Sequence, residues 1–484
     1  MGAIDVRPVL YVIGSMLGII AIAMLIPMAA DLTTGHRDWQ AFAVSALVTL
    51  FFGVLIMLTN RTPGVRLSLR QTFLLTTLSW IAVCVCAAIP FSFTEVRLSY
   101  TDALFEATSG LTSTGATVIA GLDTAPAGIL LWRALLNWLG GIGIVALGIA
   151  ILPFLRVGGM QLFKSESSDK SEKVLPRAAD LAFALGWVYL ILTLACAALL
   201  ALAGMPMFDA VCHAMTALAT GGFSTRDASI GAYGNPAVEW IVTLFMYLGA
   251  LPFVRFISFA RGDYRAIWQD SQVRRFTYML LAIGGGLGLW VSATQGVSIP
   301  TGLRLAMFNV VSIVTTTGFV TTDYQLWGAP AVSLFFVLML LGGCTGSTSG
   351  GIKMFRLELL ALVLRQQVSR LYTPRRVMPL TYNGKPVDTD ILLSATAFVF
   401  VYLAALLLIG LVLGLMGLDL VTAVTGATMA VGNIGPGLGD IIGPAGNFSS
   451  LPDGVKWVLS FGMLLGRLEL FTVLVLLSPR FWRA

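Results

Sequence analysis

Long apolar stretches follow one another along this chain, separated by short polar or basic segments. A bilayer core needs about 20 mostly apolar residues per crossing helix. Ten stretches meet that length, at about residues 9–30, 39–58, 71–93, 125–152, 178–203, 235–260, 275–293, 328–360, 391–416 and 455–478. The pattern therefore predicts an all-α polytopic membrane protein with about 10 spans.

The composition supports the same class. The 484 residues are 57% hydrophobic and 11% charged, whereas soluble domains carry about 25% charged residues. This excludes disordered, collagen-like, secreted disulfide-rich and nucleic-acid-binding proteins. The five cysteines lack C-x-x-C spacing and the two histidines lie far apart, so the sequence offers little material for a metal site or a catalytic nucleophile. We expect no organic cofactor on this chain and no nucleic-acid partner.

The basic residues indicate the orientation in the membrane. With the N-terminus in the cytoplasm, 23 of the 30 Lys and Arg residues fall in inner loops or termini. Such an excess of basic residues is typical of the cytoplasmic side. We therefore expect both termini in the cytoplasm, and we attribute the net charge of +6 to topology rather than to an anionic partner.

Four apolar segments of about twelve residues are too short to cross and end in glycine- and hydroxyl-rich strings. The strings are Ser113-Thr114-Gly115, Thr220-Gly221-Gly222, Thr316-Thr317-Gly318 and Asn433-Ile434-Gly435. Twelve positions before the last glycine of each string stands an alanine: Ala103, Ala210, Ala306 and Ala423. Agreement at fixed offsets indicates an internal repeat, in which each unit is a span, a half-helix, a filter-like string and a second span.

The repeat divides the chain into five parts. Residues 1–60 form an N-terminal helical hairpin, and the pore repeats are residues 61–165, 166–265, 266–378 and 379–484. Four quasi-equivalent units around one axis would close a single pore within the chain. Non-helical backbone at membrane depth is tolerated where protein buries it or where it lines a watery cavity, which also favours a pore.

The chemistry of the strings points to a cation. Helix C-termini carry partial negative charge, and backbone carbonyls can replace the hydration shell of an ion. Glycine permits the dihedral angles that turn such carbonyls toward an axis. We therefore predict a filter for a dehydrated monovalent cation, with the cation-binding groups in the four strings.

Acidic residues follow the strings at nearly constant offsets. Asp227, Asp323 and Asp440 stand five positions after their glycines, and Asp123 stands eight positions after Gly115. Acidic groups around an entrance concentrate cations by focusing the electric field. We interpret these residues as an outer mouth, with solvated turn residues as the alternative.

The eighth stretch is interrupted by ten uncharged residues, 342–351, which cannot remain helical because five of them are glycines. These glycines are Gly342, Gly343, Gly346, Gly350 and Gly351. The segment is not a phosphate-binding P-loop, since that motif needs Gly-Lys-Ser/Thr in sequence, and here Ile352 separates the last glycine from Lys353. A helix break buried by neighbouring spans is the simpler alternative to a functional loop.

Four charged or titratable side chains lie in apolar surroundings. Arg467 and Glu469 stand within the last stretch, where an ionised group is costly and usually faces a cavity or a partner. A pair between them is not expected, because residues two apart on a helix point away from each other. Glu106 and His213 precede their glycines by nine positions, and we interpret them as anchors of the half-helices.

The glycine strings, the NIGPGLG segment and the C-terminal LGRLELFTVLVLLSP segment together resemble the Trk/Ktr/HKT superfamily of potassium transporters, most closely the TrkH family. The resemblance covers essentially the whole chain. It implies potassium (K+) uptake across the bacterial inner membrane, a homodimer in membrane lipid with one pore per protomer, and a cytosolic TrkA-type nucleotide-binding regulatory subunit. It also implies that residues 342–351 form an intramembrane gate loop and that Arg467 lies beneath the filter as an ion barrier.

Two other functions are compatible with a polytopic chain. A membrane enzyme would need a nucleophile and base or an acidic metal cluster within the spans, and the spans hold almost no His or Asp. An alternating-access transporter of another solute predicts inverted repeats and broken helices, whereas these repeats run in one orientation. The sequence leaves open whether conduction is channel-like or coupled to protons or sodium. Because threonine directly precedes the aligned glycine in the first and third strings alone, with glycine in the second and isoleucine in the fourth, we expect selectivity less strict than in a four-fold symmetric filter.

Overall fold

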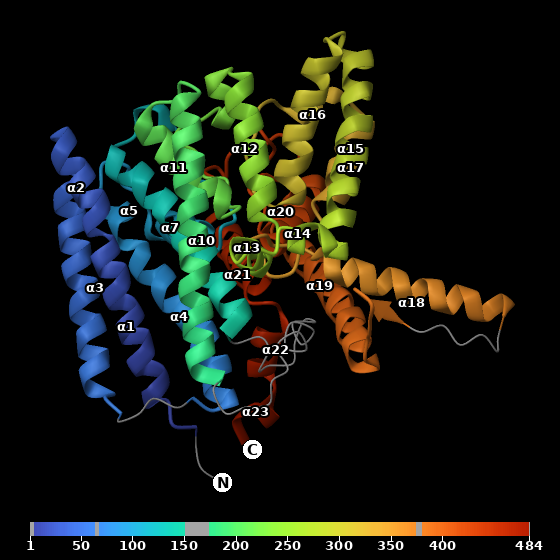
Figure 1. Ribbon diagram of the computed structural model, residues 1–484. Helices are drawn as coiled ribbons and strands as arrows, with labels where there is room; N and C mark the ends of the chain where they lie inside the picture. Colours follow the sequence, from blue (N-terminus) through green and yellow to red (C-terminus); the bar gives the residue numbers. More distant parts are fainter. Residues whose placement is uncertain (1–3, 63–66, 151–173, 374–379, 484) are drawn as a thin grey trace.

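The computed structural model describes residues 4–62, 67–150, 174–373 and 380–483. Within these residues the regular structure is almost entirely helical (Figure 1), with one antiparallel pair of two-residue strands, β1 Thr381–Tyr382 and β2 Lys385–Pro386. Seven helical segments are long and apolar enough to cross a membrane, or nine if two sharply bent pairs each count as one span. This confirms the predicted class of an all-α polytopic membrane protein.

The first three helices form a hairpin at one edge of the molecule. They are α1 Arg7–Ala23, α2 Leu25–Thr34 and α3 Trp39–Thr59. A β-carbon added to Gly14 of α1 would lie 2.6 Å from the carbonyl oxygen of Gly53 in α3. The two helices therefore pack closely because glycines face each other, as small residues allow in membranes.

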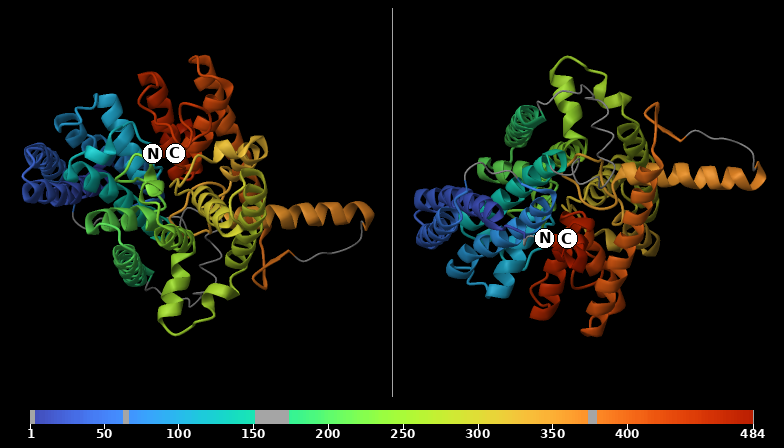
Figure 2. Two further views of the ribbon diagram at one scale, coloured as in Figure 1. Left: turned by 90° about the horizontal axis from the view of Figure 1, so that it is seen from above. Right: turned by 90° about the horizontal axis from the view of Figure 1, so that it is seen from below.

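The remaining helices fall into four groups that follow one another around a common centre when the molecule is viewed from above or below (Figure 2). The first group is α4 Leu69–Ala87, α5 Ile89–Phe93, α6 Tyr100–Leu111, η1 Leu122–Thr124 and α7 Ala127–Ala150. The second is α10 Val174–Leu202, α11 Met207–Leu218, η2 Ser229–Tyr233, α12 Pro236–Gly249 and α13 Phe253–Ala260. The third is α14 Ala266–Gln269, α15 Ser271–Gln295, α16 Ile299–Val314, η3 Tyr324–Trp327, α17 Ala329–Leu338 and α18 Met354–Tyr372. The fourth is α19 Thr389–Leu415, α20 Leu420–Gly432, α21 Asp453–Arg467, α22 Phe471–Leu477 and α23 Pro479–Arg483.

The short helices α6, α11, α16 and α20 occupy the centre, and side-chain caps fix where α6 and α20 begin. The Ser99 hydroxyl accepts a hydrogen bond from the Asp102 amide at the start of α6, and Asp419 accepts one from the Thr422 amide at the start of α20. Such side chains satisfy amides that a helix leaves free at its N-terminus. The alanine that recurs at a fixed offset is buried in all four helices, which explains the small side chain at that position.

Three of the predicted spans are interrupted. The chain bends by 96° between α12 and α13, at Pro252, which lacks the amide hydrogen that a continuing helix needs. It bends by 111° between α21 and α22, where Glu469 and Leu470 adopt left-handed backbone angles. The stretch predicted at 328–360 is α17, of ten residues, followed by an irregular segment up to Lys353. The structure therefore has fewer continuous spans than the sequence predicts.

Helix α18 leaves the bundle sideways, beyond the outline of the other helices in both views of Figure 2. Its base is tied to α15: the Ser271 hydroxyl donates to Glu358 at 2.9 Å, and Arg275 lies 3.5 Å from the same carboxylate. Burial raises the pKa of Glu358, and the Ser271 hydrogen bond and the Arg275 charge oppose that rise. α18 starts at Met354, three positions after the glycine-rich segment ends at Gly351, so the chain runs from that segment almost directly into the helix.

Candidate functional site

All four central helices end in the same turn. The amide of the residue before the last string glycine donates to the carbonyl oxygen five positions earlier, at 2.8–2.9 Å in each case: Thr114 to Ser109, Gly221 to Thr216, Thr317 to Ser312 and Ile434 to Met429. The first residue of each string has a left-handed φ, of 52° at Ser113, 49° at Thr220, 59° at Thr316 and 54° at Asn433. Each string therefore leaves its helix in the same direction.

The string glycines meet in a closed ring. A β-carbon on Gly115 would clash with the carbonyl oxygen of Gly221, and one on Gly222 would clash with that of Thr317. One on Gly318 would lie 2.7 Å from the Gly435 nitrogen, and one on Gly435 would lie 3.4 Å from the Gly115 oxygen. The contacts run from the first string to the second, third, fourth and back to the first. The structure thus brings together all twelve string residues that the sequence singles out.

The glycines are required for two separate reasons. Gly115, Gly222 and Gly318 have left-handed φ values of 89°, 69° and 86°, which residues with a side chain adopt at a cost. The fourth glycine, Gly435, has no left-handed φ and has space at ordinary contact distance. The first three positions therefore demand glycine by both backbone angle and space, and the fourth demands it less.

Buried polar side chains hold the extended segments that follow the strings against the half-helices. Glu106 accepts hydrogen bonds from the Thr117 hydroxyl and the Val118 amide and pairs with buried Arg133 at 2.7 Å. A ring nitrogen of His213 lies 2.9 Å from the Ser224 hydroxyl. These contacts confirm the interpretation of Glu106 and His213 as anchors.

A third anchor escaped the sequence analysis. Asn309 stands nine positions before Gly318, the same offset as Glu106 and His213, and donates to the Thr321 hydroxyl at 2.9 Å. Neutral asparagine in an apolar helix attracts less notice than a charged residue, but the fixed offset would have identified it.

A hollow of about 80 Å³ lies on one side of the ring, and the four aligned glycines line it. We call this the outer side and the opposite side the inner side, following the topology predicted from the sequence. Asp227 also lines this hollow and accepts hydrogen bonds from the amides of Gly121 and Leu122. The other three proposed mouth residues lie outside its wall. Asp123 is 3.6 Å from Arg226, Asp323 caps η3 by accepting from the Gln325 amide, and Asp440 is exposed. Of the four proposed mouth residues, Asp227 is therefore the one that the structure places in the wall of this hollow.

The glycine-rich segment 342–351 folds into a finger on the inner side of the ring. Its ends pair, because the Gly342 amide donates to the Ile352 carbonyl at 3.0 Å. The Cys344 amide donates to the Ala250 carbonyl at 2.9 Å, and the Thr348 hydroxyl donates to the Gly249 carbonyl at 3.0 Å. These carbonyls lie where α12 ends before Pro252, so the finger satisfies groups that the helix break leaves free.

The finger touches the inner ends of the second, third and fourth strings. The Thr348 hydroxyl is 3.2 Å from that of Thr220, and the Gly350 amide donates to the Thr316 hydroxyl at 2.7 Å. A β-carbon on Gly350 would clash with the Gly432 carbonyl oxygen. The finger therefore lies directly against the inner face of the ring.

Arg467 completes the enclosure at the first string. Its guanidinium donates to the Thr348 carbonyl at 2.8 Å, the Ser113 hydroxyl at 3.1 Å and the Gly140 carbonyl at 3.3 Å, and the residue is 3% exposed. Glu469 forms its ion pair with Arg356 of α18 instead. The expectation that Arg467 and Glu469 do not pair is correct, but they stand at a helix break and not on one continuous span.

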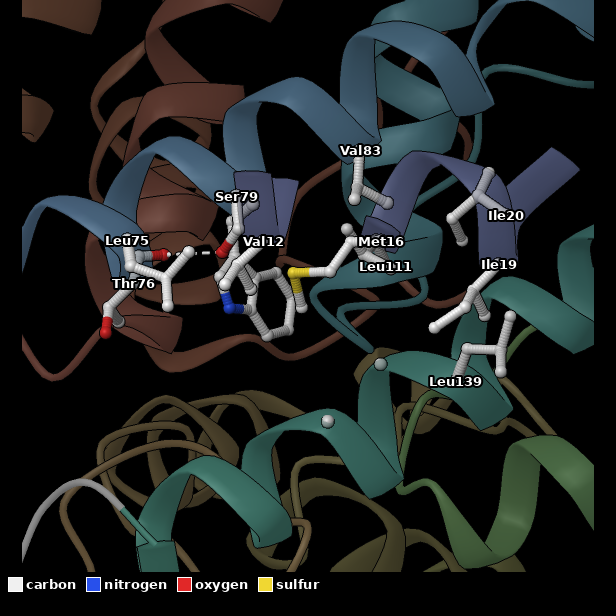
Figure 3. Close-up of a pocket in the computed structure, with 13 residues that line it drawn as sticks. Val12, Met16, Ile19, Ile20, Leu75, Thr76, Ser79, Val83, Leu111 and Leu139 are labelled. Carbon is white, nitrogen blue, oxygen red and sulfur yellow. Dashed lines mark hydrogen bonds between the residues drawn. The ribbon is translucent and has the colours of Figure 1, made fainter. Parts of the chain in front are cut away.

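A larger hollow, of about 370 Å³, lies away from the ring between α1, α4 and α7 (Figure 3). Val12, Met16 and Ile19 of α1 line one side, and Leu139 of α7 faces them. The hydroxyls of Thr76 and Ser79 on this wall are engaged with carbonyl oxygens of their own helix. Such an apolar wall cannot replace the water around an ion, so the ring and the hollow lined by its four glycines are the candidate site.

Together, these features define an integral membrane protein with a central constriction built from backbone, closed on one side by a loop and a buried arginine. Comparison with known proteins identifies the family to which the chain belongs. A sequence model of the TrkH family, described as cation transport proteins, matches residues 38–484. The chain belongs to this family, which is a family of transporters rather than enzymes, as the sequence predicts.

Similar proteins cover nearly the full length. The Trk system potassium uptake protein TrkI of Halomonas elongata is 46% identical over 98% of this chain and 97% of its own. The Trk system potassium uptake protein TrkH of Escherichia coli K12 is 36% identical over 99% of each. The crystal structure of the potassium transporter TrkH from Vibrio parahaemolyticus matches with a TM-score of 0.92 and 35% identity, covering 99% of this chain and 100% of that one.

Proposed function

We propose that this protein carries potassium into the bacterial cell through a selectivity filter made by its four strings, one from each of the units 61–165, 166–265, 266–378 and 379–484. The observation that carries the proposal is the closed ring of glycine contacts at the C-termini of four buried helices. Helix C-termini favour a cation, and backbone carbonyls suit a dehydrated monovalent one. The names of the similar proteins support potassium as that ion.

The deciding experiment is uptake of potassium or radioactive rubidium by a bacterial host that lacks its own potassium uptake systems. Expression of the full chain together with its regulatory partner should restore growth at low potassium, and empty vector is the control. Uptake of an organic solute with no potassium transport would contradict the proposal. Replacing external potassium by sodium in the same cells measures how strict the selectivity is.

We propose further that the finger 342–351 and Arg467 close the pathway on the inner side. The finger contacts three of the four strings, and Arg467 contacts the remaining one. A passing ion would have to displace the finger and overcome a fixed positive charge at low dielectric. Asp227 is the mouth residue that the geometry favours, because it alone of the four proposed carboxylates lines the outer hollow.

Regulation by a cytosolic TrkA-type subunit is proposed to act through α18. Both ends of the described chain lie at one end of the bundle, because Phe73 at the start of α4 packs on Phe481 of α23 at 6.3 Å and α1 starts at the same end (Figure 1). The distribution of Lys and Arg assigns this end to the cytoplasm. Basic residues follow on this side at Arg261, Arg265, Arg274, Arg275, Arg365 and Arg370; Arg375 and Arg376 lie outside the described residues. Since α18 continues directly from the finger, a partner that moves α18 would move the gate.

A homodimer embedded in membrane lipid is the proposed assembly. The projecting part of α18 presents large apolar side chains to its surroundings, with Leu364 65% and Leu371 84% exposed. Apolar area of this kind on a helix that leaves its own bundle suits a second copy of the chain. Native mass spectrometry of the purified protein should give a dimer, and the Leu371→Asp variant should shift it toward monomer.

A further inference from the structure

A small polar hollow lies beneath the finger, lined by the finger, the fourth string, the break after α21 and residues of α7, α18, α19, α20 and α21. Its volume is about 20 Å³, enough for one water-sized particle. Lys353, Arg356, Arg467 and Glu469 all contribute to its wall. The three cationic residues are each at most 8% exposed.

The charges on this wall do not balance. Arg356 is compensated by its ion pair with Glu469 and by the Phe398 ring, which lies 3.6 Å from its guanidinium carbon. Arg467 donates to a hydroxyl and two carbonyl oxygens and, within the described residues, has no carboxylate partner. Lys353 has one long hydrogen bond, 3.5 Å, to the Ser347 carbonyl. Buried charges are normally paired, so two cationic side chains remain to be neutralised.

Unused donors line the same hollow. The Nε atoms of Arg356 and Arg467 and the hydroxyl of Tyr402 are buried without a hydrogen-bond partner among the described residues. Asn433 adds one unpartnered acceptor, its side-chain oxygen, which lies toward Gly466. Among the unpartnered side-chain atoms of the described wall, donors therefore outnumber acceptors, and this surplus agrees in sign with the surplus of positive charge.

We infer that this hollow binds a small monovalent inorganic anion, such as chloride, held by Lys353, Arg467, Arg356 and the Tyr402 hydroxyl. An anion fits the size, the net charge and the donor set at once, whereas a potassium ion would face uncompensated positive charge. A water molecule would fit the size and use donors, but it would leave the charge unbalanced. The hollow shares Arg467 and the end of the finger with the proposed inner closure. The inference goes beyond that closure and does not depend on which ion the filter passes.

The test uses the full chain in detergent with bromide as the probe. Thermal unfolding is followed in potassium bromide and in potassium gluconate at equal ionic strength, and bromide should raise the midpoint along a saturable curve. Crystals grown in bromide should show an anomalous peak in the hollow. Equal midpoints in the two salts, or crystals without bromide at this place, would overturn the anion site in favour of water.

Two matched variants separate the site from general salt effects. Tyr402→Phe removes one donor and keeps the ring, and should weaken the apparent bromide affinity by about tenfold, as expected for a hydrogen bond to a charged group. Tyr324→Phe removes a hydroxyl that is equally buried and unpartnered but lies outside the hollow, and should leave the bromide affinity unchanged. An equal loss in both variants, or in neither, would contradict the assignment.

Discussion

Replacing Gly222 by serine tests the filter where the structure makes the strongest demand for glycine. A serine at φ 69° would cost about 1–2 kcal/mol in the left-handed region. Its β-carbon would also clash with the Thr317 carbonyl oxygen of the neighbouring string. That oxygen must withdraw from its place in the ring, so the geometry around an ion changes at the contact between the second and third strings.

The expected result is a loss of selectivity with flux retained. Free energies of 1–2 kcal/mol correspond to factors of about 5–30, so we expect the potassium-to-sodium permeability ratio to fall by roughly tenfold. The measurement is the reversal potential of protein in planar bilayers with potassium on one side and sodium on the other. Size-exclusion profiles and unfolding midpoints must match the unsubstituted protein for the comparison to count.

Two control substitutions distinguish the ring from backbone strain. Gly204→Ser has a comparable left-handed φ, 96°, but nothing within 4 Å of the added carbon, so it should leave the permeability ratio unchanged. Gly435→Ala lies in the ring but has no left-handed φ and a nearest contact of 3.4 Å, so its effect should be smaller than that of Gly222→Ser. An unchanged ratio in Gly222→Ser, or a larger loss in Gly435→Ala, would refute the reasoning.

Three further outcomes follow from the site. Arg467→Ala should raise potassium flux in proteoliposomes, because a fixed positive charge opposes a nearby cation, by about 4 kcal/mol for two unit charges about 4 Å apart at an effective dielectric of about 20. Arg467→Lys keeps the charge and should not raise the flux, and reduced flux in a folded Arg467→Ala protein would indicate a purely structural arginine. Deleting residues 345–349 should raise potassium flux in proteoliposomes without the regulatory partner, since the shortened finger no longer reaches the ring. Flux equal to that of the intact chain would show that the finger is not the gate. Glu106→Ala should lower the unfolding midpoint strongly, because leaving the Arg133 charge buried without its carboxylate costs about 3–5 kcal/mol. The double variant with Arg133→Met should recover much of the loss, and equal midpoints for Glu106→Ala and the unsubstituted protein would show that the pair is not needed.

Local sequence by itself predicts much of the architecture. Apolar length determines the spans, because hydrocarbon tolerates little else. The fixed offsets of alanine and glycine identify the four half-helices and their strings, since each alanine must be small to be buried and three of the glycines must adopt left-handed angles. Glu106 and His213 were identifiable as anchors because a charged or titratable group in an apolar helix needs a nearby partner.

Other features depend on residues distant in the chain, and the tertiary structure alone decided them. The last span breaks after Arg467, where the guanidinium reaches Thr348 and Ser113 and Glu469 pairs with Arg356; a hydropathy pattern records the length of a span but not the partners that hold it bent. Asp123 lies near Arg226, Asp323 caps a short helix and Asp440 is exposed. The sequence does not predict these differences, because the direction of each side chain depends on the loop around it. The order of the ring and the charge imbalance beneath it likewise arise only where four separate units meet, since neither exists within any one segment of sequence.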